Sequence, residues 1–185
     1  MLSSRLYAFA AVLALTAPGC DLVGASDALG DVSSSDRAEL ADLTGAFFDC
    51  DAEVREVTDR ASGTLESGDC LQTDGSYQDF YAFRLDERAD VRVEMTSSEV
   101  APYLFLLEAD LGSSDPLVEV DRDRNATRTD RAGVSATLPA GLYLLYANSV
   151  SADETGDYTL SVEADATSEN RPAARASVGG GSGRK

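Results

Sequence analysis

The stretch Gly68-Asp-Cys-Leu-Gln-Thr-Asp-Gly-Ser-Tyr-Gln-Asp-Phe-Tyr-Ala-Phe-Arg-Leu85 decides the fold, because in it a polar turn runs directly into an alternating strand. The dipeptide Asp74-Gly75 is typical of a turn. After it, every second residue from Asp79 to Leu85 falls on one face, which is the period-two pattern of a half-buried strand. Asp79 is the one acid on that inward face, and we expect it to accept backbone hydrogen bonds from the 74–76 turn.

The same rhythm continues to about Glu163. Many short strands at regular spacing, with turn residues between them, predict an all-β antiparallel β-sandwich of about eight strands. The segment 102–108 is apolar on both sides, as expected of a central strand or a strand beneath a loop. The eight predicted strands are 61–67, 77–85, 90–97, 102–108, 117–121, 133–138, 142–148 and 157–163.

The charge of the chain limits its partners. The 185 residues include 33 acidic and 15 basic side chains, and the formal net charge is −18. Nucleic acid is not expected as a partner, because phosphate binding requires a basic face. The length fits one domain with appendages.

The first 19 residues have the pattern of a signal peptide, with Arg5 before the apolar run 6–15 and small residues before Cys20. The pattern resembles a bacterial lipoprotein signal, in which the cysteine after the cleavage site carries lipid. It departs from that pattern at Ala17, where leucine is usual. The resemblance predicts lipidation of Cys20 and attachment to a bacterial membrane, facing the periplasm or the cell surface. An ordinary secretory signal followed by a free cysteine is the alternative.

The segments that flank the strands contain runs of small and polar residues, of which 24–35 has too few apolar side chains to pack. Residues 20–56 are predicted to be a lipidated tether, which contains a short helix over 36–47 capped by Ser35. Residues 164–185 are small, polar and glycine-rich, and this composition predicts a disordered tail.

Cys50 and Cys70 remain as an even pair once Cys20 is assigned to lipid. In a compartment outside the cytosol such a pair favours a disulfide. The loop of about 20 residues that it would close corresponds to about 3 kcal/mol of stabilisation. Two buried thiols are the alternative.

Four landmarks carry a family resemblance. They are Gly-Asp-Cys-Leu-x-x-Asp-Gly-Ser-Tyr-x-Asp-x-Tyr-x-Phe (68–83), Met-Thr-Ser-Ser-Glu-Val-Ala-Pro-Tyr-Leu-Phe-Leu-Leu (95–107), Leu-Pro-Ala-Gly-x-Tyr (138–143) and Thr-Gly-Asp-Tyr-Thr-Leu-Ser-Val (155–162). Residues 57–163 thereby resemble the bacterial pre-peptidase C-terminal domain. The resemblance implies a jelly-roll-like β-sandwich that accompanies secreted proteases, with relatives in collagenases that bind collagen and calcium. The chain departs from the family in containing no protease domain.

Catalytic groups are scarce. The chain has no histidine, and its single lysine is Lys185. No GxSxG, HExxH or P-loop motif occurs. We therefore expect a non-enzymatic cell-envelope lipoprotein whose sandwich binds a protein or a glycan. Phe80 and Tyr146 are the aromatic residues that the strand pattern places outward. The alternative is a calcium-dependent, collagen-binding-type module or an accessory domain of a secreted protease system.

One set of oxygen ligands could bind a metal. Asp121, Asp123 and Asn125 occupy alternate positions, and carboxylate and amide oxygens suit Ca²⁺. Ca²⁺ needs more ligands than these three, and Arg122 and Arg124 bring positive charge close to them. A solvated loop of alternating charge is the alternative. We therefore expect no cofactor and at most weak calcium binding.

Overall fold

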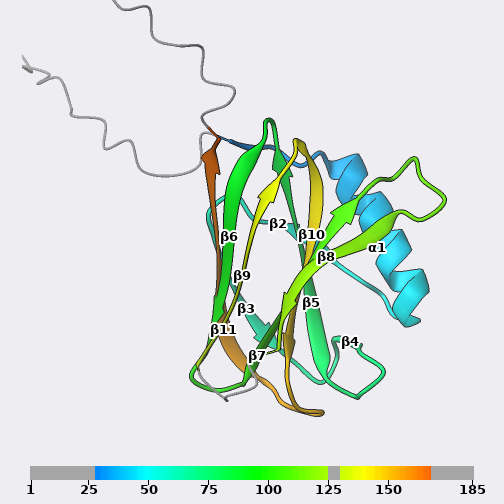
Figure 1. Cartoon of the computed structure of the whole chain (residues 1–185). Coiled ribbons are helices and arrows are strands. Elements are labelled where there is room, and N and C mark those ends of the chain that lie inside the picture. The colour runs from blue at the N-terminus through cyan, green and yellow to red at the C-terminus, as the bar shows by residue number, and fades with distance from the viewer. Residues whose placement is uncertain (1–27, 125–129, 168–185) are drawn as a thin grey trace, which may run out of the picture.

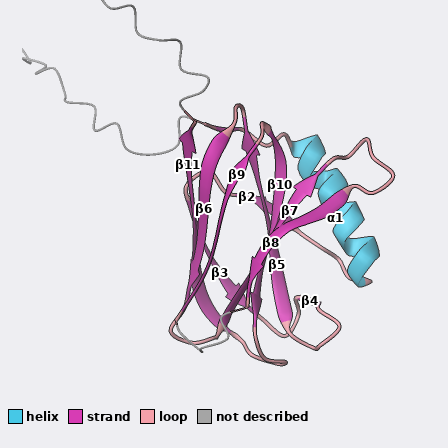
Figure 2. Cartoon of the chain, viewed as in Figure 1, coloured by secondary structure: helices cyan, strands magenta, loops and turns pink. Residues whose placement is uncertain are grey.

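In the described part of this protein two β-sheets lie face to face, and one helix lies against the outer side of the larger sheet (Figure 1). The structure is a computed structural model, and it describes residues 28–124 and 130–167. The larger sheet contains β1 (Leu29–Gly30), β2 (Val54–Glu56), β4 (Cys70–Leu71), β5 (Tyr77–Leu85), β7 (Pro102–Ala109), β8 (Leu117–Asp123) and β10 (Gly141–Ser149). The smaller sheet contains β3 (Arg60–Leu65), β6 (Ala89–Thr96), β9 (Arg131–Leu138) and β11 (Gly156–Ala166), and the helix α1 spans Ser34–Phe48 (Figure 2).

The order of the long strands is that of a jelly roll. It is β5-β10-β7-β8 in the larger sheet and β3-β11-β6-β9 in the smaller one, with antiparallel neighbours throughout. From β3 to β11, successive long strands lie alternately in the smaller and the larger sheet, except that β7 and β8 both lie in the larger sheet. This path describes two Greek keys, the connectivity of a jelly roll. The predicted fold class and all eight predicted strands are confirmed.

The core between the sheets consists of the side chains that the period-two pattern placed inward. On β5, the residues Tyr81, Phe83 and Leu85 are at most 2% exposed. Each such side chain stabilises the fold by about 1.5–3 kcal/mol when it leaves water. The other strands contribute Val91, Val93, Met95, Leu104, Leu106, Val134, Leu138, Tyr143, Leu145, Tyr158, Leu160 and Val162 to the same core.

Three short strands cover the free edge of β5. Leu29 of β1 lies opposite Leu85, Val54 of β2 lies opposite Phe80, and Cys70 of β4 lies beside Gln78. An uncovered edge would present unpaired backbone groups to other chains. The short strands therefore protect one margin of the larger sheet.

The predicted tether is wrong from Ala28 onward, because residues 28–56 pack on the sandwich. Ala28 is fully buried in the core between the sheets, and Leu40 is fully buried beneath α1. The helix can pack in this place because the outer face of the larger sheet is itself apolar. The helix is also longer than predicted, and its N-cap is Ser33, whose Oγ accepts from the backbone N–H of Asp36 at 3.1 Å. Ser35 is therefore not the cap.

The other boundaries differ less. β11 extends to Ala166, three residues beyond the predicted end of the domain. The signal peptide, Cys20 and the tail after Thr167 lie outside the described residues. In the described part, α1 is too short and too polar to cross a bilayer.

Candidate functional site

The outer face of the larger sheet carries a second apolar cluster. Strand register places Phe80, Tyr146 and Phe105 side by side on β5, β10 and β7. The ring of Phe48, at the end of α1, lies 5.7 Å from the ring of Phe80 and 5.6 Å from that of Tyr146. The helix therefore covers the β5 side of this face. As a result, Phe80 and Tyr146, which the strand pattern correctly placed on the outer face, are only 2% and 6% exposed.

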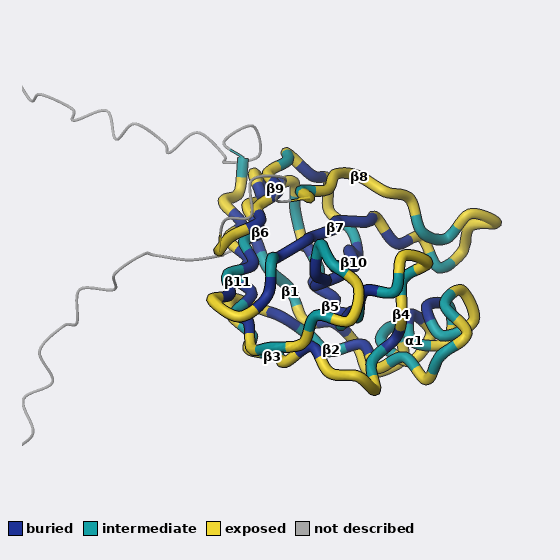
Figure 3. The backbone as a smooth tube through the Cα atoms, turned by 90° about the horizontal axis from the view of Figure 1, so that it is seen from below, coloured by how far each residue is buried: buried dark blue, intermediate teal, exposed yellow. Residues whose placement is uncertain are grey.

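Between α1 and β8 the same face is not covered, and a groove of about 620 Å³ remains. Figure 3 shows α1 and β8 on the two sides of the inner strands, and most of β8 is exposed. Phe105, Leu107 and Tyr146 contribute to the groove from the sheet. Pro116 and Leu117 line it from the β8 side. A mostly apolar groove with a few polar groups is typical of a binding site.

The helix presents two neighbouring stripes. Leu40 and Thr44 are buried against the sheet, one helical turn apart. Leu43, Ala46 and Phe47 form the next stripe, and all three line the groove. Phe47 is 76% exposed, which makes it the most exposed large apolar side chain among the described residues. In the sequence, Phe47 is the last residue of the helix predicted over 36–47, and no pattern there marks it as a candidate contact.

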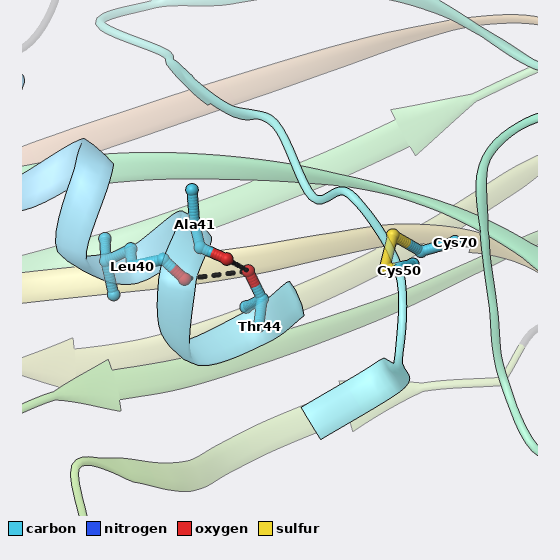
Figure 4. The surroundings of a disulfide bond; sticks show 5 residues. All are labelled: Leu40, Ala41, Thr44, Cys50 and Cys70. Atoms are coloured by element: carbon cyan, nitrogen blue, oxygen red, sulfur yellow. Dashed lines mark hydrogen bonds between the residues drawn. A yellow bond between two sulfur atoms is a disulfide. The ribbon is translucent and has the colours of Figure 1, made fainter. Parts of the chain in front are cut away.

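Both ends of α1 are fixed to the sandwich. Near its start, Asp36 forms an ion pair with Arg84 of β5 at 2.7 Å. The Ser33 hydroxyl, together with Arg84, lowers the pKa of Asp36 despite the opposing effect of burial. Near its end, the predicted disulfide is present and joins Cys50 to Cys70 of β4 (Figure 4). The positions of Phe47 and Phe48 beside the sheet are therefore fixed.

Gly45 allows α1 to end where it does. The N–H of Cys50 donates to the carbonyl of Gly45 at 3.1 Å, and Asp49 between them has the left-handed φ of 55°. A Cβ at position 45 would lie 2.8 Å from the Cys50 carbonyl oxygen. The glycine is thus required by the close return of the chain toward the disulfide.

The rim of the groove is predominantly acidic. Asp115 and Glu119 line it on the β8 side, together with Arg122, which lies 3.4 Å from Glu119. On the other side, Asp42 is exposed one turn before Ala46 on α1, and Asp49 is exposed as the C-cap directly after the helix. The apolar interior of the groove is therefore bordered by carboxylates on both walls.

A second polar cluster lies at the margin of the main core. Asp79 forms an ion pair with Arg55 of β2 at 2.5 Å and accepts a hydrogen bond from the Tyr158 hydroxyl. That hydroxyl also lies 2.9 Å from the hydroxyl of Tyr81, and the Arg55 guanidinium lies 4.6 Å from the centre of the Tyr81 ring. The expected role of Asp79 is wrong, because Asp74 Oδ1 accepts from the turn instead, through the N–H and hydroxyl of Ser76.

This cluster is structural. Burial raises the pKa of Tyr158 far above its usual value, and the negative charge of Asp79 adds to the effect. Tyr158 and Tyr81 are 3% and 1% exposed, so a substrate cannot reach them. A side chain at Gly63 would collide with both hydroxyls, which explains the glycine at that position of β3.

The proposed metal ligands are only partly placed. Asp121 and Asp123 lie on β8, where Asp121 Oδ1 accepts from the N–H of Arg122 at 2.8 Å. Asp123 Oδ2 accepts from the N–H of Gly133 on β9 at 2.9 Å. Asn125 lies outside the described residues. Within 28–124 and 130–167, no group of three His, Cys, Asp or Glu side chains is arranged to hold a metal ion. Calcium binding at this edge stays a prediction.

Comparisons with known proteins find similar folds at low sequence identity. No protein-family model and no curated protein matches the sequence. The pre-peptidase C-terminal domain of a collagenase from Bacillus anthracis is 16% identical, with a TM-score of 0.44, over 60% of this chain and 96% of that one. PliG from Aeromonas hydrophila, a periplasmic inhibitor of g-type lysozyme, is 15% identical, with a TM-score of 0.43, over 60% and 96% of the two chains. CorA, a surface-associated copper-binding protein of Methylomicrobium album BG8, is 10% identical, with a TM-score of 0.45, over 60% and 98%. At this level of similarity, the ligands of these proteins do not indicate a ligand for this chain.

Proposed function

We propose that this protein is a non-enzymatic, lipid-anchored protein of the bacterial cell envelope that binds a protein partner in the groove between α1 and β8. The observation that carries the proposal is the 76% exposure of Phe47 at a groove of about 620 Å³. An exposed aromatic side chain beside an apolar pocket is the usual composition of an interaction hot spot. The helix that presents it is fixed at both ends, so little ordering is needed on binding.

A protein partner fits the groove better than a glycan does. Its described lining is largely aliphatic and aromatic, and the polar side chains lie mainly at the rim. Glycan sites require polar groups that reach the sugar hydroxyls beside an exposed aromatic ring. The aromatic rings that the sheet contributes to this groove, Phe105 and Tyr146, are each less than 10% exposed and offer a sugar little surface. An apolar side chain of a protein would fill this interior without leaving buried hydroxyls unpaired.

Photo-crosslinking in intact cells tests the proposal. A photoreactive phenylalanine analogue replaces Phe47 in the full chain, and a matched control places it at Ser135, which is exposed on the opposite, smaller sheet. We expect an adduct of defined mass from position 47, and no such adduct from position 135. A second substitution, Ala46→Trp, places a large side chain in the groove and should abolish the adduct. If position 47 gives no adduct, or if Ala46→Trp leaves it unchanged, the groove is not the binding site.

The lipid anchor has its own test. Cys20→Ala should abolish incorporation of labelled palmitate and move the protein from the detergent phase to the aqueous phase. Unchanged labelling in this variant would leave an ordinary secreted protein, while the groove proposal would be unaffected.

A further inference from the structure

We propose that the segment bound in the groove is cationic, with an aromatic or aliphatic side chain flanked by lysine or arginine. This inference rests on the proposed function, because it concerns the chemistry of the partner at the same groove. Two features of the described structure lead to it. They are the apolar interior of the groove and the acidic residues on both of its walls.

The helix wall carries an acidic stripe. Glu39 and Asp42 are exposed and lie one turn apart on α1, and Asp49 is the exposed C-cap residue directly after the helix. Because Asp42 lies one turn before Ala46, which lines the groove, this acidic stripe lies near the margin of the groove. The stripe contains no basic residue, so its negative charge is available to a partner.

The opposite wall adds to the same potential. Asp115 and Glu119 line the groove from the β7–β8 loop and from β8. Arg122 is the one basic residue among the described lining residues, and it forms an ion pair with Glu119. A basic side chain that leaves the apolar interior in either direction would therefore meet carboxylates.

The charge of the whole domain acts in the same direction. Of the 33 acidic and 15 basic residues, three acidic and six basic ones lie outside the described ranges, which leaves 30 acidic and nine basic residues and a net charge of −21. Such a field speeds the encounter with cationic partners and slows the encounter with anionic ones. A second copy of this chain carries the same charge, so self-association through the groove is disfavoured. The charge also disfavours binding of an anionic lipid surface by this face.

The apolar interior and the acidic rim of the groove have different roles in recognition. The apolar interior holds one or two apolar side chains against Phe47 and Phe105, and this contact controls the dissociation rate. The acidic rim selects the charge of the flanking residues and controls the association rate. A ligand must therefore have both properties to bind well, which gives the proposal a selective test.

Three synthetic peptides of one length provide the test. The first has phenylalanine and leucine at helical spacing with lysine elsewhere, the second has glutamate in place of lysine, and the third has serine in place of the apolar residues. Binding to the full lipidated chain in neutral detergent is measured by fluorescence anisotropy. We expect only the first peptide to bind measurably, with a loss of roughly tenfold or more in affinity between about 0.05 M and about 0.5 M salt.

Variants separate the groove from non-specific attraction to an acidic protein. Phe47→Ala and Ala46→Trp should each weaken the first peptide by roughly tenfold or more. Asp42→Asn with Asp49→Asn should slow its association severalfold. Glu163→Gln with Asp165→Asn removes the same charge from exposed positions on the other sheet, and should leave binding unchanged.

Equal binding of the first two peptides, or equal effects of the two charge-removing pairs, would overturn the cationic specificity. Binding of the third peptide as tight as that of the first would show charge attraction without the groove. If a partner crosslinks at position 47 while these peptide preferences fail, the proposed function stands and this inference falls. If the crosslink itself fails, the proposed function falls.

Discussion

The substitution Asp79→Ala tests whether the buried ionic cluster joins the two sheets. Asp79 lies on β5 of the larger sheet and Tyr158 on β11 of the smaller one, and the hydrogen bond between them crosses the interior of the sandwich. Removing the carboxylate leaves the Tyr158 hydroxyl with Tyr81 as its remaining partner. It also leaves the Arg55 guanidinium without its counter-charge.

The magnitude follows from the burial of each partner. The Tyr158 side chain is almost completely buried, so its hydrogen bond to a charged acceptor contributes about 1.5–3 kcal/mol. The Arg55 side chain is 35% exposed and can be rehydrated, so its ion pair contributes only about 0–1 kcal/mol. We therefore expect Asp79→Ala to lower the free energy of unfolding by about 1.5–4 kcal/mol.

Urea unfolding followed by far-ultraviolet circular dichroism measures this loss. Tyr158→Phe should lower the free energy of unfolding by about 1–3 kcal/mol, because it removes the bridging hydroxyl. The double variant should lose less than the sum of the two single losses, with a coupling of about 1 kcal/mol or more. Arg55→Met retains the packing over Tyr81 and should have a small effect. Additivity of the two main substitutions would refute the bridge between the sheets.

Three further predictions concern stability and metal. Replacing Cys50 and Cys70 together by alanine should lower the free energy of unfolding in urea by about 3 kcal/mol. The reason is that the disulfide joins residues 20 positions apart and so restricts the unfolded chain. A loss below about 1 kcal/mol would contradict this reasoning. Burial raises the pKa of Tyr146 to about 12. The stability that the neutral side chain contributes is therefore fully present below about pH 10, the pKa of an unfolded tyrosine, and is lost as the pH rises toward 12. Unfolding free energies at rising alkaline pH should fall less steeply in Tyr146→Phe than in the wild type, and equal slopes would exclude this cause. The melting temperature should be the same in calcium and in chelator, because Asp123 already accepts from the N–H of Gly133; a shift that Asp123→Ala abolishes would establish a calcium site.

The strands and the main core could be predicted because each strand has one buried face. The period of two in Tyr81, Phe83 and Leu85 is imposed by the pleat, so it is visible in any window of the sequence. The disulfide could be predicted because only two cysteines remain for the domain. The partner of Asp79 could not be predicted, because Tyr158 is 79 residues away and no local pattern encodes that contact.

The packing of the N-terminal segment 28–56 on the sandwich could not be predicted, for a different reason. The run 24–35 is small and polar, and the tether that this run indicated was extended through the predicted helix to residue 56. Only the fold shows that Leu40 and Phe48 lie on an apolar sheet face that needs covering. The signal for that face was present in 102–108, which is apolar on both sides. A strand of this kind needs a covering element, and the predicted helix carries Leu40, Leu43 and Phe47 at helical spacing.

The acidity of the domain has a second consequence at β8. This strand is the last one on its side of the larger sheet, and Val118 and Val120 are 50% and 38% exposed along it. An exposed apolar edge beside an apolar groove would favour pairing between copies. Asp121 and Glu119 lie on the same strand, and every approaching copy carries the same excess of negative charge. The charge therefore opposes edge pairing while leaving the groove open to the proposed basic segment, so one surface property would serve both dispersion of the copies and selection of the partner.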